Sequence, residues 1–174
     1  MKRKLDLLNF GTIAFGQRFE VTPIQMITML ATIGNNGVYI RPHLVKEIIS
    51  KTEKDENGIN KVTKIEKEEG ERVLSEETAK NVLSMMQTVV EEGTGKKAKV
   101  EGYNVGGKTG TSEDGVNTGK YIASFIGIAD VKDPSVVILV VLYNPKGEGG
   151  HSGGGVRSYT CWKHIKRNFS IFKC

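Results

Sequence analysis

Cysteine, tryptophan and long apolar runs are scarce in this chain of 174 residues. Both cysteines, Cys161 and Cys174, and the only tryptophan, Trp162, lie within residues 157–174, so the body of the chain has no cysteine that could indicate a redox compartment. The longest apolar run spans residues 136–142, which is far too short to cross a bilayer. The sequence therefore predicts no membrane-spanning segment.

A signal peptide is not expected either. Residues 1–4 have the basic character of a signal-peptide start, but Asp6, Asn9 and Gly11 interrupt any apolar region after them. With 38% hydrophobic and 26% charged residues, the chain has the composition of a soluble globular domain, and its length fits one domain.

Positive charge is concentrated at one end of the chain. Residues 1–156 carry 20 Lys and Arg against 20 Asp and Glu and have no net charge, whereas residues 157–174 carry five basic residues and no acid, which accounts for the net charge of +5. A neutral body without a basic face argues against a nucleic-acid partner. The change in composition divides the chain into a body, residues 1–156, and a basic tail, residues 157–174.

Two helices are predicted in the body. The first begins with Thr22 as cap, Pro23 in the first turn and Gln25 closing a capping box, and it ends at Gly34. Its expected apolar stripe consists of Ile24, Ile27, Leu30 and Ala31.

The second helix is capped by Ser75 and ends at Gly93. Its expected stripe consists of Ala79, Val82, Leu83, Met86 and Val90. The methionines of the two helices are expected to fill the core: Met26, Met29, Met85 and Met86.

Strand patterns occupy much of the remaining body. Residues 43–50 and 59–67 form an expected exposed hairpin around the charged turn 54–58, and residues 121–129 and 135–143 form a second hairpin. A further strand is expected over residues 103–112. The predicted fold class is α+β, an antiparallel sheet of about three to five strands with helices packed on it. The run 136–142 is apolar without alternation, which predicts a strand covered on both faces.

The segment Gly106-Gly107-Lys108-Thr109-Gly110-Thr111-Ser112 is open to two interpretations. Residues 102–109 match the phosphate-binding P-loop pattern, and residues 108–110 match the K-T-G element of penicillin-recognising serine enzymes. A P-loop needs a buried strand before it and a helix after it, but residues 95–101 are charged and residues 110–119 are rich in glycine and turn formers.

The K-T-G interpretation fits the surrounding residues better. Glycines in a strand remove side chains where another backbone must come close, as for a peptide bound along the strand edge. A glycine-rich hairpin with one exposed lysine explains the same residues without any function.

Beyond this segment, the chain resembles the C-terminal part of the transpeptidase domain of class B penicillin-binding proteins, the division and sporulation types. The resemblance covers about residues 5–156. The segments that carry it follow the order of the family: residues 15–17 (FGQ), 21–26 (VTPIQM), 34–37 (GNNG), 41–43 (RPH), 92–95 (EGTG), 107–112 (GKTGTS) and 123–127 (ASFIG).

The resemblance implies roles for the K-T-G residues. Members of the family acylate a serine with a D-Ala-D-Ala stem peptide of peptidoglycan, and β-lactams mimic that dipeptide. Lys108 then places an ammonium near the active-site hydroxyls and the terminal carboxylate of the substrate, and Thr109 and Thr111 offer hydroxyls to this carboxylate. Gly110 leaves room for the acyl chain. The backbone N–H of Thr111 is one of two donors to the oxyanion.

Two other elements of the family pattern are missing. No S-x-N occurs in the sequence, and the only S-x-x-K, residues 170–173, follows K-T-G instead of preceding it. Ser112 and Ser124 have no histidine nearby in sequence, and His43 and His151 are expected to be solvated loop residues. The sequence thus offers no nucleophile and predicts a chain that is inactive by itself.

The basic tail departs from the family pattern at Arg157, which suggests a shifted or truncated reading frame. The apolar residues of the tail keep an approximately helical spacing, so the tail can alternatively cover the sheet or rest on an anionic membrane surface. A zinc site from His151, Cys161, His164 and Cys174 matches no known ligand spacing, so no metal and no cofactor are predicted.

Three functions remain open at this point: a penicillin-binding transpeptidase fragment, a non-catalytic fold that binds a peptide or a partner, and a P-loop nucleotide binder. The resemblance implies peptidoglycan stem peptides, β-lactams and a missing N-terminal part of the same domain as partners. It also implies a place at the extracytoplasmic face of the cell membrane, through an anchor that this sequence lacks. Without the missing segments, exposed helix faces and a sheet edge predict dimerisation or aggregation.

Overall fold

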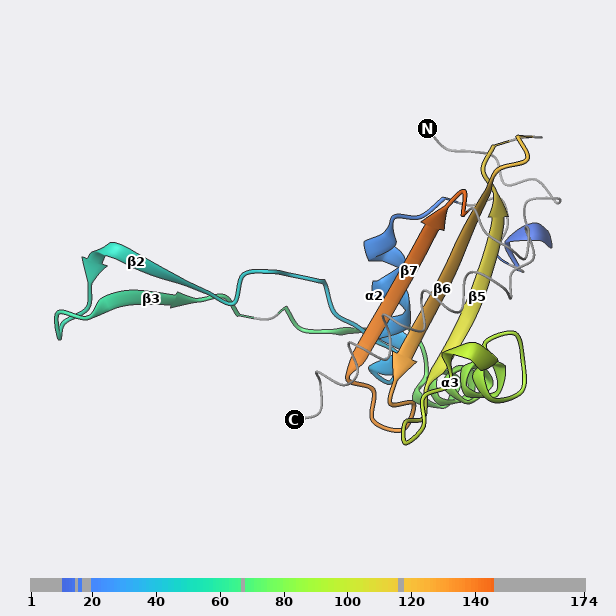
Figure 1. Ribbon diagram of the computed structural model, residues 1–174. Coiled ribbons are helices and arrows are strands. Elements are labelled where there is room, and N and C mark those ends of the chain that lie inside the picture. Colours follow the sequence, from blue (N-terminus) through green and yellow to red (C-terminus); the bar gives the residue numbers. More distant parts are fainter. Residues whose placement is uncertain (1–10, 15, 17–19, 67, 116–117, 146–174) are drawn as a thin grey trace.

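The computed structural model describes residues 11–14, 16, 20–66, 68–115 and 118–145 (Figure 1). Two helices, α2 (Pro23–Gly34) and α3 (Glu76–Glu91), and a 3-10 turn, η1 (Lys96–Ala98), accompany the strands. The strands are β1 (Val38–Tyr39), β2 (Glu47–Lys54), β3 (Asn60–Lys64), β4 (Glu71–Arg72), β5 (Gly106–Glu113), β6 (Tyr121–Ala129) and β7 (Val136–Tyr143). The described residues thus contain the predicted α+β mixture.

The central sheet is antiparallel and has the order β5-β6-β7. Lys108 of β5 is paired with Ile126 of β6, and Ile126 is paired in turn with Leu139 of β7. Strand β6 has the predicted bounds, β7 begins one residue later than predicted, and β5 begins at Gly106 instead of residue 103. Helix α2 packs on β6 and β7, and α3 packs on β5, so the predicted sheet with packed helices is confirmed (Figure 1).

The hydrophobic core forms two clusters, to which alternate residues of β6 contribute. Ile126 and Ile128 pack with Leu30 of α2 and Leu83 of α3, whereas Phe125 and Ala129 pack with Val90 of α3 and Ala98 of η1. Because successive side chains of a strand point to opposite faces, these clusters lie on the two faces of the sheet. Helix α3 contributes to both clusters and packs on β5.

Helix α2 begins as predicted but buries a different face. The Thr22 hydroxyl accepts the backbone N–H of Gln25, and the Gln25 side chain accepts the backbone N–H of Thr22, which completes the capping box. The helix buries Leu30 and packs Met26 and Ile33 beside it, whereas Ile24 remains 53% exposed and Ala31 is exposed. The predicted stripe was therefore wrong in part, because apolar residues cover most of the circumference of this helix outside the side that carries Gln25, Thr28 and Thr32.

Helix α3 follows its prediction more closely. The Ser75 hydroxyl accepts the backbone N–H of Thr78, and Ala79, Leu83 and Val90 are buried. Met86 of α3 and Met26 of α2 pack against the core, but Met29 and Met85 are 51% and 67% exposed. The prediction that all four methionines fill the core was wrong for the last two.

The chain turns tightly between α2 and β1. Gly37 has a φ of +82°, and its carbonyl accepts the backbone N–H groups of Val73 and Leu74. A side chain at Gly37 would collide with the Leu74 carbonyl. The Arg72 guanidinium donates to the carbonyls of Asn36 and Leu74, at 2.8 and 3.2 Å. These contacts hold the short pair β1–β4 beside the end of α2.

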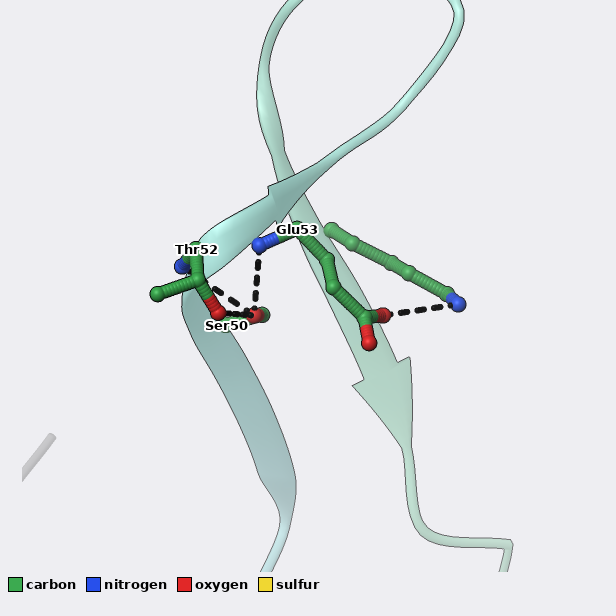
Figure 2. A network of polar contacts seen from close by, with 4 residues as sticks. Ser50, Thr52 and Glu53 are labelled. Carbon is green, nitrogen blue, oxygen red and sulfur yellow. Dashed lines mark hydrogen bonds and ion pairs between the residues drawn. The ribbon is translucent and has the colours of Figure 1, made fainter.

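Strands β2 and β3 form the predicted hairpin, which projects from the body as a separate arm (Figure 1). β2 begins at Glu47, later than the predicted residue 43, and its register with β3 shifts between Ile49 and Lys54. At this irregularity the Ser50 hydroxyl accepts the backbone N–H groups of Thr52 and Glu53, at 3.3 and 2.9 Å (Figure 2). The side chain thereby satisfies donors that the shifted ladder leaves unpaired.

Strand β7 is less buried than predicted. Val136, Ile138 and Val140 pack against one core cluster, and Val137 and Leu139 pack against the other. Every residue from Val136 to Leu142 is nevertheless only half-buried, so both faces make apolar contacts without being fully covered.

Candidate functional site

A cavity of about 640 Å³, lined by polar and apolar residues, lies beside strand β5. Its lining combines the K-T-G segment with residues of β6, of α2 and of the segment before α2: Ala14, Gly16, Met26, Lys108, Thr109, Gly110, Thr111, Ser112, Ser124 and Ile126. All the residues that the sequence proposes as functional, Lys108 to Thr111, thus line one hollow.

The pleat of β5 separates these side chains onto two faces. Lys108 and Gly110 oppose Ile126 and Ser124 of β6, on the face that α2 covers. Thr109 opposes Phe125, on the other face. Because the strand lies at the side of the sheet, as Figure 1 shows, groups from both faces can reach one ligand at this edge.

Lys108 presents its charge to solvent. The side chain is exposed, and its ammonium donates to the Thr109 carbonyl at 2.7 Å. None of the salt bridges within the described residues includes Lys108. An ammonium with a neutral backbone partner and no carboxylate partner keeps its attraction for an anion in the cavity.

Side chains of β6 lie close to Gly107 and Gly110 of β5. The Phe125 ring covers Gly107 and Gly127, and a Cβ on Gly127 would lie 2.8 Å from this ring. The Ser124 hydroxyl would collide with a Cβ on Gly110. The described contacts show clearance for side chains of the adjacent strand, and the predicted clearance for a bound peptide backbone stays a prediction.

Two hydroxyl groups near the site have no role assigned from the sequence. Thr94, in the turn after α3, has its hydroxyl 3.0 Å from the Thr109 hydroxyl, and Ser124 projects from β6 into the cavity. Both residues belong to segments that the sequence marks, 92–95 and 123–127, but their roles depend on contacts with β5 that periodicity does not contain.

The described residues do not test the prediction that the chain offers no nucleophile. Ser112 and Ser124 line the cavity, but no histidine lines it, and His43 is exposed in an irregular segment as predicted. Ser170, the basic tail and the zinc alternative with His151, Cys161, His164 and Cys174 lie outside the described residues, as does the boundary at residue 156. Within the part of the chain that is described, no cluster of metal-binding side chains occurs.

The P-loop alternative does not fit the fold. Lys108 and Thr109 lie inside strand β5, and this strand continues to Glu113. A P-loop places the corresponding residues at the start of a helix, whose N-terminus holds the phosphates. The required helix is replaced by a strand.

Comparison with known proteins shows the family to which this fold belongs. The profile of the penicillin binding protein transpeptidase domain matches residues 2–159. The chain therefore belongs to this family, and its relatives are class B penicillin-binding proteins, as the resemblance in the sequence predicted.

Two curated relatives illustrate the match. The chain is 45% identical over 142 residues to stage V sporulation protein D of Bacillus subtilis, covering 79% of this chain and 21% of the relative. It is 33% identical over 160 residues to the peptidoglycan D,D-transpeptidase FtsI of Escherichia coli, covering 89% of this chain and 24% of the relative. The chain thus spans about a fifth to a quarter of the length of these relatives.

Solved structures show the same fold. Penicillin-binding protein 3 of Mycobacterium tuberculosis in its apo form superimposes with a TM-score of 0.76 at 27% identity, covering 94% of this chain and 39% of that one. The same protein complexed with aztreonam gives a TM-score of 0.74 at 27% identity, covering 92% and 38%. This neighbour binds a β-lactam.

No helix among the described residues is long and apolar enough to traverse a membrane.

Proposed function

We propose that this chain is the part of a class B transpeptidase domain that binds the carboxylate end of a peptidoglycan stem peptide, and that it binds β-lactams through the same contacts. In the complete protein, this part serves cross-linking of the cell wall at the extracytoplasmic face of the membrane. The sequence contains neither S-x-N nor an S-x-x-K before K-T-G, so we propose that the chain alone binds without being acylated.

One observation carries the proposal: an exposed ammonium and several hydroxyls line one cavity. Lys108 supplies a positive charge without a carboxylate partner among the described salt bridges, and Thr109 and Thr111 line the same cavity. The terminal carboxylate of D-Ala-D-Ala and the carboxylate of a penicillin have the same charge and similar geometry, so both suit this set of groups. The aztreonam complex of the mycobacterial neighbour supports a β-lactam as ligand.

The remaining roles follow from the family. The Thr111 backbone N–H is proposed to donate to the oxyanion that forms when a nucleophile attacks the bound carbonyl. Gly110 is proposed to leave room for the acyl chain; on its Cβ side, this room is bounded by Ser124. The nucleophile would be supplied by the missing N-terminal part of the domain.

The experiment combines two measurements on the purified chain. Isothermal titration calorimetry with benzylpenicillin measures reversible binding, and a gel with a fluorescent penicillin measures covalent labelling. Lys108→Ala removes the charge at the site, whereas Lys51→Ala removes a charge from the projecting hairpin and serves as the matched control (Figure 1). Circular dichroism verifies that every variant is folded.

We expect reversible binding that Lys108→Ala weakens about tenfold or more, since a hydrogen bond to a charged group contributes about 1.5–3 kcal/mol. Lys51→Ala should bind like the unmodified chain, and no protein should be labelled. A folded chain that does not bind, or equal binding by the two variants, would overturn the proposed site. Covalent labelling would overturn the proposed inactivity, and Ser170 would then be the first residue to test.

A further inference from the structure

Resting on the proposed function, we infer that Thr94 is a positioning residue that acts through Thr109. Its hydroxyl holds the Thr109 side chain in one rotamer and accounts for one hydrogen bond of that side chain. The Thr109 proton then remains directed at the carboxylate of the ligand. This assigns a purpose to the Glu92–Gly95 segment, which the proposed function leaves without one.

The turn that carries Thr94 is closely constrained. After α3 ends, the backbone N–H groups of Gly93 and Gly95 both donate to the Val89 carbonyl, at 3.1 and 3.0 Å. A Cβ on Gly93 would lie 2.9 Å from this carbonyl oxygen, and one on Gly95 would lie 3.1 Å from it. Larger residues would therefore open the turn. Two glycines folded onto one carbonyl hold Thr94 between them.

The residues on both sides of the turn that carries Thr94 are buried in the core. Val90, which precedes the turn, is 1% exposed, and Ala98, which follows it, is 3% exposed; both pack in the same cluster as Phe125. Phe125 is the β6 partner of Thr109 in the sheet. The turn and the K-T-G strand are therefore held by one packed cluster, and this brings the two hydroxyl oxygens to 3.0 Å.

The chemistry of two facing hydroxyls favours one direction of donation. Each threonine hydroxyl has a single proton and can also accept. A carboxylate can only accept, so it selects the arrangement in which Thr94 donates to Thr109 and Thr109 donates to the carboxylate. A donor that is itself accepting a hydrogen bond is polarised and donates more strongly. Lys108 contributes charge to the same carboxylate, whereas this pair contributes a directed hydrogen bond.

The test compares Thr94→Val, which loses the hydroxyl but keeps the shape, with Thr94→Ser, which keeps the hydroxyl. Thr88→Val is the control, because the Thr88 hydroxyl on α3 bonds only within its own helix, to the Ser84 carbonyl. Calorimetry measures affinity for benzylpenicillin and for its methyl ester, which lacks the carboxylate charge. NMR couplings to the Thr109 methyl carbon measure its rotamer without ligand.

We expect Thr94→Val to weaken benzylpenicillin binding about three- to tenfold, the size of one hydrogen bond, with little change for the ester. Thr94→Ser should bind benzylpenicillin like the unmodified chain. In a chain that already carries Thr109→Val, adding Thr94→Val should not weaken the binding of benzylpenicillin any further. The Thr109 couplings of ligand-free Thr94→Val should show rotamer averaging. Thr88→Val should match the unmodified chain throughout.

Equal losses for benzylpenicillin and the ester, or unchanged Thr109 couplings in Thr94→Val, would overturn the inference. If the unmodified chain binds neither compound, the proposed function fails. The couplings in the ligand-free chain then decide whether Thr94 positions Thr109, so the two failures can be distinguished.

Discussion

The Ser124 hydroxyl on β6 lies close enough to Gly110 of β5 to collide with a Cβ atom built on that glycine. The two residues are paired across the sheet, and both line the cavity beside β5. With Ser124 in this rotamer, no room remains for a side chain at the glycine of K-T-G. Mutations at Gly110 consequently change packing and binding together, and the two effects need to be measured separately.

Gly110→Ala should destabilise the chain by about 1–3 kcal/mol, because the added methyl group collides with the Ser124 hydroxyl. Ser124→Ala alone should have a small effect, and the double variant should regain much of the loss. Urea unfolding of the four proteins gives the coupling energy directly. If the effects of Gly110→Ala and Ser124→Ala on the free energy of unfolding are additive, the added methyl group does not collide with the Ser124 hydroxyl.

Leu83→Ala should destabilise the chain by about 2–5 kcal/mol, whereas Met85→Ala on the same helix should change stability by less than about 0.5 kcal/mol. Leu83 is 4% exposed and packs between the sheet and α2, and Met85 is 67% exposed. Urea midpoints measure both effects. Comparable losses would indicate that a partner covers Met85 in solution.

Replacing residues 47–64 by a short Gly-Ser linker should leave the unfolding of the body unchanged. The contacts of β2 are with β3, and the arm projects away from the central sheet (Figure 1). A two-stranded hairpin adds little stability of its own. Thermal unfolding followed by circular dichroism measures this, and a clearly lower midpoint would contradict the separate character of the arm.

The Glu76 carboxyl should titrate below its ordinary pKa of 4.5, because it accepts a hydrogen bond from Lys80 and is attracted by its charge. NMR titration should show this pKa rising toward 4.5 in Lys80→Met and staying low in Lys80→Arg. Since the folded pKa is the lower one, the pair stabilises the fold above the unfolded pKa. This stabilisation is lost as the pH falls through the folded pKa of Glu76. A Glu76 pKa at its ordinary value in the unmodified chain would contradict this prediction.

The chain should self-associate through an apolar groove of about 580 Å³ beside α2. Ile24 and Met29 line this groove and are 53% and 51% exposed. The variant Ile24→Glu/Met29→Glu should therefore elute later than the unmodified chain in size-exclusion chromatography with light scattering. Met85→Glu is the control for an added acid at an exposed methionine. A stable monomer of the unmodified chain at high concentration would contradict this.

The sequence by itself determined much of the secondary structure, because caps and periodicity are local. Thr22 and Ser75 cap their helices as predicted, and β6 has its predicted bounds. The order of the K-T-G segment and the other segments that resemble the family also indicated the family, which the comparisons confirm.

Other features followed only from tertiary packing. Apolar residues cover most sides of α2, and contact with β6 and β7 determined that Met26, Leu30 and Ile33 face the core. The contacts of Thr109 with Thr94 and of Gly110 with Ser124 join segments far apart in the chain. Periodicity describes which residues share a face of one element, but the site depends on which elements meet, and the packing of α3 and β6 around β5 decided that.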